Sequence, residues 1–113
     1  MRPGSGFVEV EVSNPEGEGW VKVKALLDGR STYARLPEDL LLRLGVRPGF
    51  RRRFVTAGEG ITRYDVAVVL IRLDGRVLPT LVVFGEEGSA PVLGAYTLME
   101  FGMVSDPAMR GGR

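Results

Sequence analysis

Two residue types that carry much of enzyme chemistry are missing from this sequence: its 113 residues include neither cysteine nor histidine. Without cysteine there are no disulfides, no thiol nucleophiles and no thiolate metal sites. Without histidine, the Ser–His and Cys–His nucleophile systems and the commonest zinc ligand are also excluded. Any acid–base chemistry must therefore come from Asp, Glu, Tyr or Lys side chains.

Lysine is also scarce, since it occurs only at positions 22 and 24, and the other positive charges are arginines. The net charge of +1 gives no general argument for binding to nucleic acid or to a membrane. The densest positive cluster, Arg51 to Arg53, is interpreted as the solvated face of a hairpin and not as a phosphate site. No apolar run reaches the roughly 18 residues of a membrane span, and no signal-peptide pattern is present. We therefore expect a cytoplasmic protein with no nucleic-acid or membrane partner.

The composition is that of a globular protein, with 44% hydrophobic and 26% charged residues. Its length predicts a single domain over residues 7–108, between a flexible N-terminus (1–6) and a flexible C-terminus (109–113). Alternating or β-branched segments predict strands over 7–12, 20–27, 65–73 and 76–84, and a hairpin over 49–64.

Two short helices are predicted between these strands. Residues 36–45 have Pro37 near the start, acidic residues in the first turn and Gly45 as a stop. Residues 95–102 form the second predicted helix, and residues 103–108 could add a last short strand. Many strands with two short helices predict a mainly β fold, a small closed barrel or sandwich.

The segment from Ala25 to Tyr33 has the most unusual pattern in the sequence. Three apolar residues lead directly into the carboxylate of Asp28, and small or hydroxylated residues follow. An Asp-Gly pair is a strong turn signal, so one interpretation is a strand that ends in an ordinary turn. A carboxylate beside a core must be paired, shifted in pKa or put to use, so a functional site is the other interpretation.

The order of several motifs resembles that of the retroviral-type aspartic proteases, in particular their small prokaryotic relatives. In that family an Ala-Leu-Val-Asp-Thr-Gly-Ala-Thr segment precedes a Leu-Pro pair and a helix that ends in Leu-Gly. Here Ala25-Leu26-Leu27-Asp28 and Leu36-Pro37 keep the same spacing without a gap. The family's second signature, two hydrophobic residues and a glycine, matches Val92, Leu93 and Gly94. The resemblance covers about residues 7–107.

This resemblance implies a retropepsin-like domain that works as a homodimer. One Asp28 from each chain would form a catalytic dyad that shares a proton, and no cofactor or metal would be needed. The catalytic loop would comprise Gly29, Arg30, Ser31 and Thr32, with Val92, Leu93 and Gly94 as the second loop. A flap at Gly58, Glu59 and Gly60 would close over an extended peptide or unfolded-protein substrate.

The sequence departs from the family at the catalytic motif, because Asp-Thr-Gly is replaced by Asp28-Gly29-Arg30. Gly29 lacks the hydroxyl that braces the two loops of the family dyad. Arg30 places a charged side chain where the family has glycine, and a nearby guanidinium favours the ionised carboxylate. Two functions therefore remain: an aspartic endopeptidase, or a catalytically degenerate dimer that uses the protease fold to bind peptides or proteins.

Overall fold

The computed structural model of the protein describes residues 6–56 and 60–103, with the backbone alone described for residues 50–56 and 60–63. Within these residues seven strands and two short helices follow one another along the chain. They are β1 (Phe7–Ser13), β2 (Val21–Leu27), β3 (Ala34–Pro37), α1 (Glu38–Arg43), β4 (Phe50–Thr56), β5 (Gly60–Leu73), β6 (Arg76–Gly85), β7 (Val92–Leu93) and α2 (Ala95–Glu100). No helix in this part of the chain is long and apolar enough to cross a membrane.

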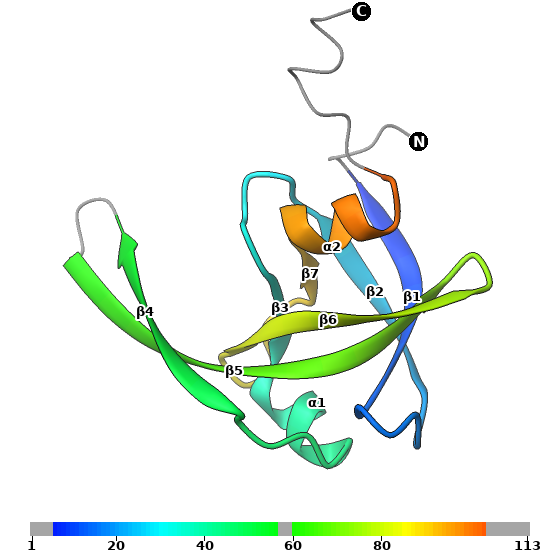
Figure 1. The fold of residues 1–113 in the computed structure, drawn as a ribbon, viewed down its shortest axis with the longest axis horizontal. Helices are drawn as coiled ribbons and strands as arrows, with labels where there is room; N and C mark the ends of the chain where they lie inside the picture. Colours follow the sequence, from blue (N-terminus) through cyan, green and yellow to red (C-terminus); the bar gives the residue numbers. More distant parts are fainter. Residues whose placement is uncertain (1–5, 57–59, 104–113) are drawn as a thin grey trace, which may run out of the picture.

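Six of the strands close into a barrel, and the seventh extends from it (Figure 1). The neighbours around the barrel are β1, β2, β7, β3, β6 and β5. Antiparallel pairing of β1 with β5, in which Val12 lies opposite Ile71, closes the ring. β4 pairs with the first half of β5, and Figure 1 shows this hairpin reaching away from the barrel. The prediction of a mainly β closed barrel with two short helices is confirmed.

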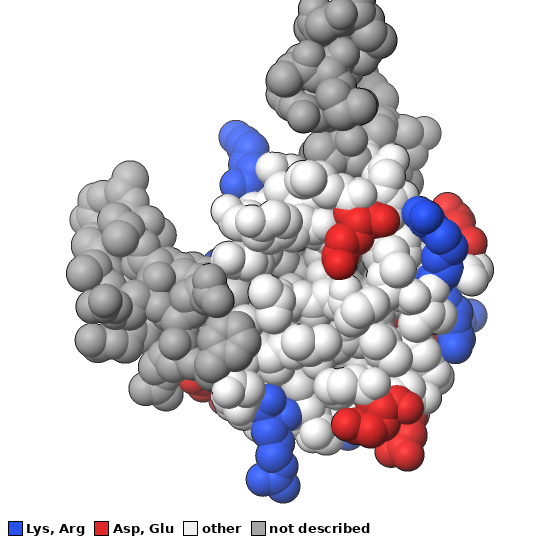
Figure 2. All heavy atoms as spheres, in the orientation of Figure 1, with Lys and Arg blue, Asp and Glu red and all other residues white. Residues whose placement is uncertain are grey.

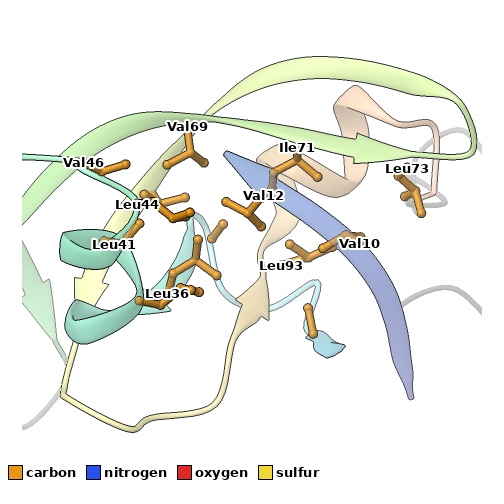
Figure 3. Close-up of a cluster of buried hydrophobic side chains, with 14 of the residues drawn as sticks. Val10, Val12, Leu36, Leu41, Leu44, Val46, Val69, Ile71, Leu73 and Leu93 are labelled. Carbon is orange, nitrogen blue, oxygen red and sulfur yellow. The ribbon is translucent and has the colours of Figure 1, made fainter. Parts of the chain in front are cut away.

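The alternation seen in the sequence places one side of β1 and of the second half of β5 inside the barrel. Val10 and Val12 of β1 face Val69 and Ile71 of β5 within the cluster drawn in Figure 3. α1 contributes Leu40 and Leu41 to the same cluster, whereas Leu42 is 54% exposed. Burial of apolar surface is the main source of stability for such a fold.

Several element boundaries differ from those predicted, and both helices end two residues earlier than expected, at Arg43 and Glu100. Leu36 and Pro37 belong to β3 and not to the helix, because Leu36 pairs with Phe84 of β6 and Pro37 is extended (φ −62°, ψ 142°). The helix therefore starts at Glu38. The predicted hairpin arm and the strand over 65–73 form one continuous strand, β5, of 14 residues. The strand considered over 103–108 lies outside the described residues from Val104 onward.

A buried pair of threonines links α2 to the barrel. The hydroxyl oxygens of Thr80 on β6 and Thr97 on α2 lie 2.7 Å apart, and both residues are buried. Because Thr97→Val removes one partner and leaves the Thr80 hydroxyl unsatisfied, we expect a loss of about 1–3 kcal/mol of unfolding free energy. Urea denaturation would measure it. The double variant with Thr80→Val should recover much of this loss, and a double variant that is as unstable as the sum would contradict the pairing.

Candidate functional site

Asp28 lies at the end of β2, where the barrel brings together segments that are distant in the sequence. β2 runs parallel to β7, with Leu26 opposite Val92 and Leu27 opposite Leu93. The Asp28 amide extends this ladder by donating to the carbonyl oxygen of Leu93 at 3.1 Å. The backbone of Asp28 is therefore fixed by the short strand that contains most of the second predicted signature.

Two hydrogen-bond donors hold the Asp28 carboxylate. The Arg30 amide donates to Oδ1 and the Ser31 hydroxyl donates to Oδ2, each at 3.0 Å. The Arg30 side chain is 99% exposed, and its Nε lies 4.0 Å from Oδ1. The Asp28 side chain remains 32% exposed. The loop therefore presents an oriented carboxylate that a second molecule can reach.

The same contacts lower the pKa of Asp28. The hydrogen bond from the Arg30 amide has the largest effect, and the Ser31 hydroxyl and the Arg30 charge act in the same direction. Partial desolvation raises the pKa but does not outweigh the donors. Asp28 of a single chain is therefore ionised near neutral pH, which suits a base more than an acid.

Gly94 allows α2 to approach the Asp28 loop closely. A Cβ atom at this position would lie 2.5 Å from the Tyr33 carbonyl oxygen and 2.8 Å from that of Ser31. Just after Gly94, the Ala95 amide donates to the backbone carbonyl oxygen of Ser31 at 2.6 Å. The Tyr96 amide donates to the backbone carbonyl oxygen of Thr32 at 3.1 Å. The two loops singled out in the sequence thus meet and are joined through their backbones.

The remaining predicted site residues are placed as follows. Gly29 is exposed, and a Cβ built on it would meet nothing within 4 Å. Thr32 is exposed and contributes its carbonyl oxygen to the contact with α2. Gly60 is the first residue of β5, whereas Gly58 and Glu59 of the predicted flap lie outside the described residues.

Sequence reasoning missed the part that Ala95 and Tyr96 play in fixing the loop. Both act through backbone amides, which every residue except proline possesses, so side-chain identity carries no signal for them. Gly94 was the available clue in the sequence, because a glycine that does not form a turn often marks a position where two backbone segments lie close together.

A cavity formed by described residues does not include the Asp28 loop. It has a volume of about 490 Å³ and is lined by β3, β5, β6 and the following loop, including Arg35, Tyr64, Phe84 and Ser89. In the described part of the chain, no group of three or more acidic side chains is placed to hold a metal ion. On the face seen in Figure 2, described charges of both signs lie in small separate groups. In a single chain the Asp28 carboxylate is partly open to solvent, and the cavity described above does not enclose it.

No protein-family model and no curated relative matches this sequence. Solved structures do match its fold. Simian foamy virus (mac) protease is similar with a TM-score of 0.64 and 21% identity, over 89% of this chain and 100% of the viral chain. EIAV protease, solved in complex with the inhibitor HBY-793, has a TM-score of 0.60 and 20% identity, over 90% of this chain and 92% of its own. The protein therefore has the fold of the retroviral proteases.

Proposed function

We propose that this protein is an aspartic peptidase that hydrolyses extended peptides at a site completed by two copies of the chain. The observation that carries the proposal is the Asp28 carboxylate, which is partly exposed at the end of β2 and oriented by two donors. The similarity to two retroviral proteases supports a peptidase on this fold. One chain supplies one such carboxylate, so the catalytic pair requires a homodimer.

In the proposed dimer two Asp28 carboxylates share one proton, because two negative charges at short range cannot both be ionised cheaply. The ionised carboxylate accepts a proton from water as the water oxygen attacks the peptide carbonyl carbon. The partner subunit's Asp28 gives its proton to the carbonyl oxygen. As the tetrahedral intermediate collapses, the C–N bond breaks and the leaving amine receives a proton from the dyad.

Two measurements on the intact protein test this function. Light scattering at micromolar concentrations should give the mass of a dimer. An unfolded protein substrate should be cleaved with an optimum at acidic pH, and a statine-type peptide bearing a hydroxyl group should block the cleavage. A monomer over the whole concentration range, or a lack of cleavage between about pH 3 and 7, would count against the peptidase.

A second function is favoured by the residues that follow Asp28. Gly29 supplies no hydroxyl to brace the two loops, and the Arg30 guanidinium helps to lower the pKa of Asp28. Both features make it less favourable for two Asp28 carboxylates to share one proton. In this alternative the dimer binds extended peptides by strand addition and does not cleave them.

The double substitution Gly29→Thr with Arg30→Gly separates the two functions. It restores the hydroxyl and removes the cation that favours the ionised dyad, so we expect peptide hydrolysis to appear or to rise by about tenfold or more. Loss of the Arg30 charge should also move the alkaline limb of the pH–rate profile to higher pH. A folded dimeric variant that shows neither change would indicate that these residues do not limit activity.

A further inference from the structure

An exposed aromatic ring lies next to the loop that carries Asp28. Tyr96, in the first turn of α2, is 53% exposed, although the opposite side of the helix is buried through Thr97, Leu98 and Phe101. Its ring centroid lies 5.4 Å from that of Tyr33, and the two planes are inclined by 44°. This separation is within the range in which aromatic rings attract each other.

Backbone hydrogen bonds link the segments that carry these two rings to the Asp28 loop. Tyr33 ends the loop that begins at Asp28, and the Tyr96 amide donates to the carbonyl oxygen of Thr32. The adjacent amide of Ala95 donates to Ser31, whose hydroxyl holds the Asp28 carboxylate. The segments that carry the two rings are thus connected to the Asp28 carboxylate through backbone hydrogen bonds and the side chain of Ser31.

A single exposed apolar residue is ordinary on a protein surface and indicates no function by itself. Tyr96 differs because its ring pairs with a second, tilted ring and its backbone amide is bonded to the loop that carries Asp28. Met99, one turn further along α2, is even more exposed at 61% but has no such connection among the described contacts. The two residues therefore form a natural comparison on one helix.

We propose that Tyr33 and Tyr96 form an aromatic platform that binds an apolar or aromatic side chain of the substrate, away from the scissile bond. This inference rests on the proposed peptide-binding function of the Asp28 site. An extended peptide that lies across Asp28 continues beyond the loop, and a side chain that packs on the exposed Tyr96 ring removes apolar surface from water.

Because the platform lies away from the reacting atoms, its binding energy is the same in the ground state and the transition state. It therefore sets the affinity for the peptide, and hence KM, while kcat stays nearly constant. An aromatic contact of this kind changes affinity by about three- to tenfold.

The test uses Asp28→Asn protein, which binds peptides without cleaving them, and calorimetric titration with two sets of peptides. One set carries a single Phe, moved position by position through a decapeptide, and the other carries Ser at the same positions. With one Phe position, Tyr96→Ala should weaken binding about three- to tenfold and abolish the preference for Phe over Ser. Tyr96→Phe should keep the preference, and Met99→Ala should leave it unchanged.

Three outcomes overturn the platform. Tyr96→Ala and Met99→Ala variants with equal affinities would show that the ring is not used, and so would an equal loss for Phe and Ser peptides. A lack of binding by every peptide would overturn the platform as well. The proposed function is judged separately, by cleavage with the protein that retains Asp28. Cleavage with an unchanged KM for Tyr96→Ala would reject the platform and leave the peptidase in place.

Discussion

Asp28→Asn is expected to reduce peptide hydrolysis by at least about 100-fold, because the neutral amide can neither accept the proton from water nor share one with a partner. The substitution keeps the size of the side chain, and Asn Oδ1 can still accept the hydrogen bond from the Arg30 amide. The dimer should therefore form as before. Initial rates on an unfolded protein at acidic pH, with the mass in solution measured in parallel, check this expectation.

Asp74→Asn is the matched control. Asp74 is exposed in the turn between β5 and β6, where its φ of +53° suits Asn as well as Asp. The control removes one carboxylate per chain, as the test variant does, and should keep full activity. If Asp28→Asn protein cleaves the substrate as fast as the Asp74→Asn control, the hydrolysis does not depend on the proposed dyad.

The pH dependence of stability gives a second test of the environment of the Asp28 carboxylate. Its folded-state pKa is lowered, so the ionised group stabilises a single folded chain above the unfolded pKa, and this stabilisation is lost as pH falls through the folded pKa. In monomeric protein, Asp28→Asn should therefore be destabilising at neutral pH, with the difference shrinking in acid. In a dimer, repulsion between two carboxylates opposes this trend, and the substitution should cost less at neutral pH.

Gly94→Ala is expected to cause a large loss of stability. The added Cβ would lie 2.5 Å from the carbonyl oxygen and 2.6 Å from the carbonyl carbon of Tyr33, and both atoms belong to the backbone. The loop and α2 would have to separate, which breaks the bonds from Ala95 and Tyr96. A loss of about 3 kcal/mol or more is expected, a large part of the stability of a typical domain.

Gly29→Ala controls for the loss of a glycine in the same region, since its Cβ would meet nothing within 4 Å. Its unfolding free energy should stay within about 0.5 kcal/mol of the wild-type value. Urea denaturation of both variants gives the comparison. Equal transition midpoints for Gly94→Ala and wild-type protein would show that α2 does not lie this close to Tyr33.

The sequence predicts the parts of this fold that depend on local pattern. Alternation located β1 and β2, and the predicted strands over 65–73 and 76–84 match most of β5 and β6. The strand β3 was missed because four residues are too few for a periodic signal, and it exists through long-range pairing with β6 and β7. Closure of β1 onto β5 likewise joins residues about 60 positions apart, which no local pattern encodes.

For the candidate site, the sequence indicated which residues take part but not the hydrogen bonds that join them. The family resemblance singled out Val92, Leu93 and Gly94 as a second loop, and in the structure the backbone of Leu93 pairs with that of Leu27 and Asp28. The two donors to the Asp28 carboxylate were not predicted. One donor is the backbone amide of Arg30, a residue considered in the sequence only for its side-chain charge. The other is the hydroxyl of Ser31, whose rotamer depends on the folded loop.

The position of β7 between β2 and β3 has a consequence for the order of folding. β2 and β3 precede β7 by more than 50 residues, yet both are hydrogen-bonded neighbours of β7 in the barrel. During synthesis the hairpin of β1 and β2 can form early, but Asp28 lacks its backbone partner until Leu93 has been made and inserted. A nascent chain therefore carries the carboxylate long before it carries the site.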